Sequence, residues 1–75
     1  MKELLIMVAK RLVDHPDEVE VHEEEREGIT TLKLKVNPDD MGKVIGKQGR
    51  IARAIRTLVK AAAISEEKKV NVEII

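Results

Sequence analysis

The chain has 75 residues, about the length of one small domain, and it contains no cysteine and no aromatic residue. These absences exclude a disulfide scaffold, a cysteine-based zinc site and any platform that stacks nucleobases on exposed rings. Fourteen basic and fourteen acidic residues give a net charge of zero, and no apolar run approaches the length that spans a bilayer. We therefore expect a single soluble, cytoplasmic domain over residues 1–75 with an aliphatic core.

Residues 2–13 are predicted to form an amphipathic helix that ends before Pro16, because the residue that precedes a proline avoids helical geometry. The buried face of this helix is predicted to consist of Leu4, Leu5, Val8 and Leu12. Ile6 and Val13 are predicted to lie off that face.

Two stretches of alternating residues predict a β-hairpin over 18–24 and 29–36, and the turn between them ends in a glycine that can adopt a positive φ. The inward side chains are predicted to be Val19, Val21, Leu32, Leu34 and Val36. The outward Lys33 and Lys35 are expected to form ion pairs across the hairpin. Their candidate partners are Glu18, Glu20 and Glu24.

The second half of the chain begins with a helix start at residues 37–38, where a capping asparagine precedes a proline at the first helical position. Asp39 and Asp40 follow and are expected to face the positive end of the helix dipole. Gly46 ends this short helix, and a second helix is predicted over residues 50–64. Its buried stripe is predicted to be Ile51, Ile55, Leu58 and Ala62.

A polar turn over residues 65–69 leads to a last strand in which Val70, Val72 and Ile74 alternate with polar residues. The predicted order of elements is α-β-β-α-α-β. We therefore expect an α+β fold in which three helices cover one face of a three-stranded mixed sheet.

The charges are segregated along the chain although they cancel overall. Residues 14–27 hold eight acidic residues and one arginine, a net charge of −7, whereas residues 41–65 hold six basic residues and no acid. The basic residues are Lys43, Lys47, Arg50, Arg53, Arg56 and Lys60. Such a patch attracts an anionic ligand within a screening length of about 8 Å at physiological salt. The charge pattern alone is more often that of a solvated helix face.

The segment Val44–Ile51 carries the most specific signal in the sequence. Gly46 and Gly49 bracket two polar residues between the two predicted helices. The first glycine suits the end of a helix, and the second permits a tight turn with no side chain between the backbone and a ligand. Exposed N–H groups at the start of the next helix, together with the positive end of its dipole, suit a phosphate group.

The side chains around these glycines favour nucleic acid over a small anion. Lys47 stands in the loop, and Arg50 and Arg53 lie one turn apart on the following helix, an arrangement suited to a sugar–phosphate backbone. Ile45 and its aliphatic neighbours supply a floor on which bases rest, so aromatic rings are not required.

The order of elements and the glycine motif resemble the KH domain of type II, the bacterial form, and above all the small stand-alone bacterial KH proteins of the KhpA type. The resemblance extends over the whole chain. It departs from the family pattern at one point, because the aliphatic residue expected third after the second glycine stands second here, as Ile51, with Ala52 in the third place.

The resemblance implies a non-enzymatic protein that binds single-stranded RNA, as an RNA chaperone or a post-transcriptional regulator. In KH domains the GxxG loop clamps the backbone of about four nucleotides. The RNA-binding residues implied here are Ile45, Gly46, Lys47, Gln48, Gly49, Arg50 and Arg53. The resemblance also implies a homodimer and a larger KH-containing partner of the KhpB type, and it implies no cofactor.

Two alternatives stay open at this level. Nothing in the sequence requires a 2′-hydroxyl group, so single-stranded DNA is an alternative ligand. The protein is alternatively an adaptor that pairs with itself or with another KH protein. The small residues Ala54, Thr57 and Ala61 form an edge on the last helix where a second helix can approach closely.

Neither a metal site nor a catalytic site is predicted. His15 and His22 stand seven residues apart with no cysteine to complete a zinc site. Ser65 has no histidine near it in the sequence, which leaves a nucleophilic triad without support. Gln48 occupies the place where a Walker-type phosphate loop requires serine or threonine.

Overall fold

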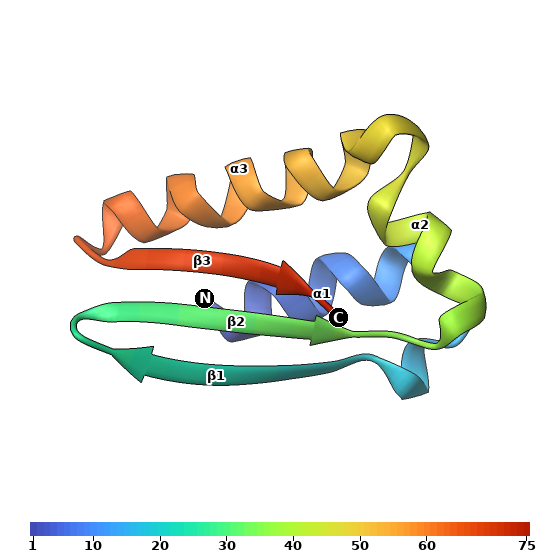
Figure 1. Cartoon of the computed structure of the whole chain (residues 1–75), viewed down its shortest axis with the longest axis horizontal. Helices are drawn as coiled ribbons and strands as arrows, with labels where there is room; N and C mark the ends of the chain where they lie inside the picture. Colours follow the sequence, from blue (N-terminus) through green and yellow to red (C-terminus); the bar gives the residue numbers. More distant parts are fainter.

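Three α-helices and three strands follow one another in the predicted α-β-β-α-α-β order in the computed structural model, which describes residues 1–75 (Figure 1). The helices are α1 (Lys2–Leu12), α2 (Met41–Ile45) and α3 (Arg50–Ser65), and the strands are β1 (Glu20–Arg26), β2 (Ile29–Lys35) and β3 (Lys69–Ile74). Single turns of 3₁₀ helix occupy Pro16–Glu18, Pro38–Asp40 and Lys47–Gly49. None of the helices combines the length and the apolar character needed to cross a bilayer.

The strands are arranged in the order β1-β2-β3. The antiparallel pair β1 and β2 is closed by Glu27 and Gly28, which have φ values of 53° and 79°. A two-residue turn of this kind matches the twist of the strands, so β1 runs to Arg26, two residues past its predicted end. β3 pairs with β2 in parallel, and α2 and α3 form the crossover connection that a parallel pair needs (Figure 1).

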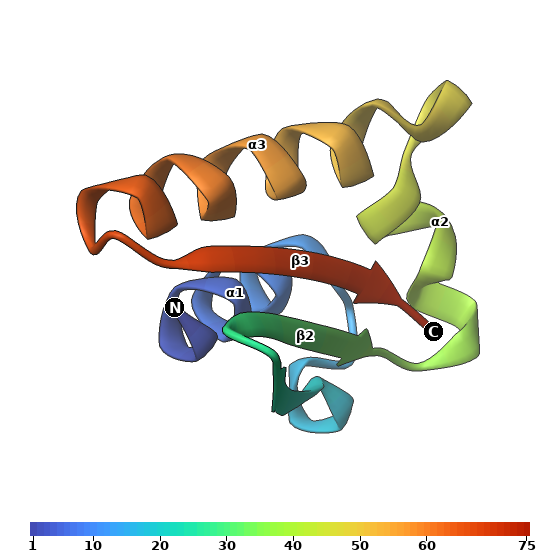
Figure 2. The same cartoon turned by 60° about the vertical axis from the view of Figure 1, so that its left-hand side comes forward.

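One face of the sheet packs against the helices, and the opposite face is polar. In Figure 1, α1 lies behind the sheet and α3 runs beside β3, and Figure 2 shows the same arrangement after a turn of 60°. The buried side chains of the strands and of the segment after β2 are Val21, Leu32, Leu34, Val36, Val70 and Val72. On the polar face Lys33 Nζ lies 3.3 Å from the Glu24 carboxylate, which confirms one of the ion pairs predicted across the hairpin. Lys35 forms no ion pair.

The buried face of α1 differs from the predicted one. Leu5 and Ala9 are fully buried, and Val13, just past the helix end, is also buried. The remaining residues of the predicted face are half-buried: Leu4, Val8 and Leu12. The prediction that Val13 lies off the core was wrong, because spacing of four carries the buried line from Leu5 through Ala9 to that residue.

The buried stripe of α3 is rotated from the predicted one by one residue. The buried side chains are Ala52, Ile55, Val59 and Ala63. Leu58, predicted to be in the core, is 46% exposed, and Ile51 and Ala62 are half-buried. Alanines at both ends of the stripe leave room for the helix to pack closely on β3, and the larger Leu58 lies outside the stripe.

Candidate nucleic-acid interface

The residues between α2 and α3 form an exposed bend, as predicted from the two glycines. Gly46 ends α2 with φ 74° and ψ 176°, and its N–H donates to the Gly42 carbonyl oxygen at 2.8 Å. One turn of 3₁₀ helix follows, and Gly49, with φ 73° and ψ 16°, stands in the left-handed region immediately before Arg50. Gln48 also has a positive φ of 57°, which costs a residue with a Cβ about 1 kcal/mol. The chain therefore changes direction between α2 and α3 through Gly46, Gln48 and Gly49, whose positive φ values lie outside the α-helical range.

The two glycines serve different physical purposes. A Cβ added at Gly46 would stand 2.6 Å from Ile51 Cγ1, so this position allows the start of α3 to pack against the end of α2. A Cβ added at Gly49 would meet nothing within 4 Å. Gly49 therefore leaves open space at the surface, while Gly46 is required by the packing inside the bend.

The departure of this sequence from the KH pattern has a structural explanation. Ile51 is half-buried and packs against Gly46, whereas Ala52, in the place where an aliphatic residue was expected, is 4% exposed and lies in the core. The large aliphatic side chain that the pattern places third after Gly49 is here at the second position, as Ile51, where it packs against the bend.

The side chains of the bend and its flanks are accessible. Lys47 and Gln48 are exposed, and Ile45 is 36% exposed at the last position of α2. Val44, one residue earlier, is completely buried and anchors α2 in the core. The two aliphatic residues therefore have different roles: Val44 packs α2 into the core, and Ile45 exposes apolar surface beside the loop.

The basic residues of α3 lie along two sides of the helix. Arg50 and Arg53 border a shallow apolar surface together with Ala54 and Leu58. None of the cations Lys47, Arg50 and Arg53 forms an ion pair. They are therefore not neutralised by any carboxylate of the chain.

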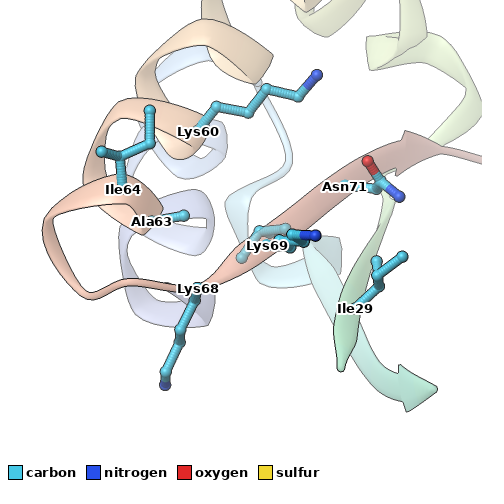
Figure 3. Close-up of a pocket in the computed structure, with 8 residues that line it drawn as sticks. Ile29, Lys60, Ala63, Ile64, Lys68, Lys69 and Asn71 are labelled. Atoms are coloured by element: carbon cyan, nitrogen blue, oxygen red, sulfur yellow. The ribbon is translucent and has the colours of Figure 1, made fainter. Parts of the chain in front are cut away.

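Arg56 and Lys60 occupy the side of α3 that faces β3. Arg56 Nε donates to the Val72 carbonyl oxygen of β3 at 3.3 Å, and Lys60 lines a hollow that also includes Asn71 of β3 (Figure 3). Sequence reasoning did not assign these two residues to the interface. The available signal was their spacing, since Arg56 follows Arg53 by three residues and Lys60 follows Arg56 by four, and residues so spaced share a helix face.

The buried carboxylate of Asp40 connects the start of α2 to the segment that follows α1. Asp40 is 1% exposed, and its Oδ2 accepts hydrogen bonds from the backbone N–H of His15 at 3.0 Å and from His15 Nδ1 at 2.9 Å. Lys43 lies over the pair, with its Nζ 3.9 Å from Asp40 Oδ1 and bonded to the carboxylate of Asp14. Asp40 stands at the N-terminal end of α2, as predicted, and it is in addition buried. Its carboxylate also joins the segment after α1 to the start of α2.

These contacts shift three pKa values. The hydrogen bond to Asp40 raises the pKa of His15, against the opposing effect of desolvation. Burial by itself would raise the pKa of Asp40, but the bonds from His15 and from the backbone N–H groups of Asp14 and His15 together lower it. The bond to Asp14 raises the pKa of Lys43. The charged forms of His15 and Asp40 are thus favoured together.

Comparison with known proteins gives a consistent result. The family description "KhpA/KhpB, KH domain" matches residues 2–74. A Clostridium perfringens protein named RNA-binding protein KhpA is 67% identical over 75 residues, with 100% of both chains covered. A Bacillus subtilis protein of the same name is 49% identical over 74 residues, 99% of this chain and 91% of that one. Among solved structures, Era from Aquifex aeolicus has a TM-score of 0.64 at 16% identity, over 97% of this chain and 28% of that chain, a likeness of fold alone.

Proposed function

The chain belongs to the KhpA/KhpB family of KH domains, and from this membership we propose that it binds single-stranded RNA without catalysing a reaction. Relatives that match it over their full length carry the name RNA-binding protein. The observation that carries the proposal is the exposed bend from Gly46 to Gly49, which has open space at Gly49 and three unpaired cations around it. The role is that of an RNA chaperone or post-transcriptional regulator in the cytoplasm, where its RNA ligands are made.

The bend clamps the sugar–phosphate backbone of about four nucleotides in this proposal. Gly46 and Gly49 shape the loop, Lys47 and Gln48 contact phosphates, and Ile45 carries the adjacent bases. Arg50 and Arg53 neutralise phosphates along the start of α3. Three phosphates neutralised on a single strand give a slope of about −2 for the logarithm of the binding constant against the logarithm of the salt concentration.

Replacing the two polar loop residues tests the site. We expect Lys47→Asp with Gln48→Asp to abolish binding of a single-stranded RNA tetranucleotide, because two carboxylates would stand against its phosphates. Both side chains are exposed, so the circular dichroism spectrum and the melting temperature should stay close to those of the wild type. Fluorescence anisotropy with labelled RNA measures the effect.

The matched control is Met7→Asp with Lys10→Asp, which changes the net charge by the same amount at two exposed positions of α1. The control variant should retain RNA binding. If the loop variant binds RNA as tightly as the control, the bend is not the site. Repeating the titration with DNA of the same base sequence determines whether the 2′-hydroxyl group contributes.

We also propose that the chain forms a homodimer through the exposed side of α3. Leu58, 46% exposed near the middle of the helix, lies among the small residues Ala54 and Ala61. A two-fold axis through this point brings two α3 helices together antiparallel, so that each surface meets itself.

Leu58→Arg tests this interface by placing two buried charges at the two-fold axis. We expect the variant to be monomeric by light scattering at concentrations where the wild type is dimeric, with an unchanged circular dichroism spectrum. Arg26→Leu, which alters an exposed residue at the far tip of the hairpin, is the control and should leave the mass unchanged. A monomeric wild type would exclude the dimer. If the wild type is monomeric but binds a KhpB-type protein through this face, the adaptor role takes its place.

A further inference from the structure

Three polar contacts join the segment that follows α1 to the segment that begins α2, and together they are called the latch below. The latch consists of the pairs Asp14–Lys43, His15–Asp40 and Glu18–Asn37. The partners stand 19 to 29 residues apart in the sequence, so the fold rather than local order brings them together. The latch lies at the same end of the molecule as α2 and the glycine bend (Figure 1).

α2 is too short to hold its own position. Its five residues, Met41–Ile45, form little more than one turn, and a helix of this length is unstable without contacts to the rest of the protein. Val44 anchors the far end of α2 in the core, and the latch holds its start. Gly46 follows the last residue of α2 directly, so a change in the tilt of α2 moves the bend with it.

Asp40 serves the latch instead of its usual local role. It is the N-cap residue of α2, yet its side chain makes no capping hydrogen bond with that helix. Its Oδ2 accepts two hydrogen bonds from His15, while its Oδ1 is buried with no hydrogen-bond partner. A buried carboxylate oxygen without a partner destabilises a fold, and such features are retained where a function requires them. This arrangement indicates a role for Asp40 beyond stability.

Protons reach the latch through His15. The side chain of His15 is 44% exposed, whereas that of Asp40 is 1% exposed. The hydrogen bond to Asp40 raises the pKa of His15. The ion pair is therefore complete below the ordinary histidine value of 6.5, and its positive charge is lost as the pH rises through the higher value that His15 has in the folded protein.

The other charged groups around this ion pair also favour the charged imidazole or are themselves paired. Glu18, in the turn after His15, and Asp39, in the turn before α2, both act to raise the pKa of His15. Lys43 of α2 lies 3.9 Å from Asp40 Oδ1 and is bonded to the Asp14 carboxylate. A neutral His15 keeps a hydrogen bond to Asp40 but loses the attraction between opposite charges, so the start of α2 is held less firmly.

We propose that the latch positions the glycine bend for RNA, so that protonation of His15 strengthens RNA binding. The inference rests on the function proposed above and adds to it a control that lies outside the loop of residues 46–49. His15 is a positioning residue in this proposal, because it acts on the bend through Asp40 and α2. Linkage is reciprocal, so bound RNA in turn favours the protonated form of His15.

The position of the bend is measured without RNA from the nuclear magnetic resonance signals of the glycine Cα atoms in isotopically labelled protein. Between about pH 6 and about pH 8.5, the signals of Gly46 and Gly49 should shift with the same midpoint as the His15 ring. These shifts should disappear in His15→Gln, because glutamine donates a hydrogen bond but does not titrate. Gly28, at the hairpin turn, is the internal control and should show no such midpoint.

The effect on RNA is measured by fluorescence anisotropy with one labelled tetranucleotide over the same pH range. The wild-type affinity should fall by about five-fold, the lower end of ordinary coupling between two sites. His15→Gln and Asp40→Asn should each remove this dependence, because neither variant can form the ion pair. His22→Gln changes an exposed histidine of the hairpin and should keep the wild-type profile. The temperature is one at which circular dichroism shows every variant folded at each pH, so unfolding does not contribute.

The two measurements together separate this proposal from the proposed function. If the affinity of the wild type is constant over the pH range, the latch serves stability alone, and the bend is unaffected as the RNA site. A fall in affinity that persists in His15→Gln assigns the dependence to another group and overturns the proposal. If the wild type binds no RNA at any pH while the signals of Gly46 and Gly49 follow His15, the latch moves the bend but the function proposed for the bend fails, and the control of RNA binding fails with it.

Discussion

Gly49 and Gly28 have similar backbone conformations in very different places. Their φ values are 73° and 79°, and a Cβ at either would meet no atom within 4 Å. Alanine at each position should therefore lower the free energy of unfolding by a similar amount, about 1–2 kcal/mol, because both must hold a left-handed conformation. Gly49→Ala should in addition weaken RNA binding, since its methyl group would stand where the RNA backbone approaches.

Urea denaturation compares the stability of the Gly49→Ala and Gly28→Ala variants, and RNA titration compares their affinities. Gly28→Ala is the control, because Gly28 lies at the hairpin turn, away from the bend, and alanine there has the same conformational cost. Equal RNA affinities for the two alanine variants would contradict a close approach at Gly49. Gly46 is unsuited to this test, because its Cβ would collide with Ile51 and disturb the packing of the bend.

At the scale of the elements, the His15–Asp40 pair determines how α2 is held, and it predicts a dependence of stability on pH. The raised pKa of His15 means that its contribution is complete below the ordinary value of 6.5 and is lost as the pH rises through the higher folded value. The lowered pKa of Asp40 means that its contribution is present above 3.8 and is lost as the pH falls through the lower folded value. The pair therefore stabilises the fold most between these two pH values.

His15→Gln should remove this dependence above pH 6.5. The wild type should lose stability relative to the variant between about pH 6 and about pH 8.5, a range that brackets the titration of a histidine. The difference between the two melting temperatures measures this loss at each pH. His22→Gln is the control, because His22 is exposed and its nearest carboxylate oxygen, on Glu20, lies 4.0 Å away. A difference between wild type and His15→Gln that stays constant over this range would show that the pair does not hold the segment to α2.

The whole molecule depends on a small aliphatic core. A domain of 75 residues has a free energy of unfolding of about 4–11 kcal/mol, so one core truncation removes a large share of it. Val59→Ala should cost about 2 kcal/mol, because Val59 is completely buried. Leu58→Ala deletes more atoms but should cost less than about 1 kcal/mol in the monomer, because Leu58 is 46% exposed.

Urea denaturation at protein concentrations below self-association compares the two variants. The stripe predicted from periodicity alone reverses their order, since it places Leu58 in the core and Val59 beside it. A larger loss for Leu58→Ala than for Val59→Ala would therefore contradict the rotation of α3 seen in the structure.

The sequence by itself determined the order of the elements, the hairpin, the helix start at Asn37, the exposed glycine bend and the place of Lys47. All of these follow from residues close together in the chain, through alternation, capping and the conformational range of glycine. Element ends were predicted to within one or two residues for the same reason.

Only the tertiary structure decided which side of α3 meets the sheet, which basic residues face β3, and that His15 meets Asp40. The rotation of a helix about its axis depends on how closely its neighbours approach, and alanines at positions 52 and 63 bring α3 close to β3 at the expense of Leu58. His15 and Asp40 are 25 residues apart, and a contact at that separation is created by the topology that brings the two segments together. Local pattern sets the elements, and packing between elements sets which side chains share a site.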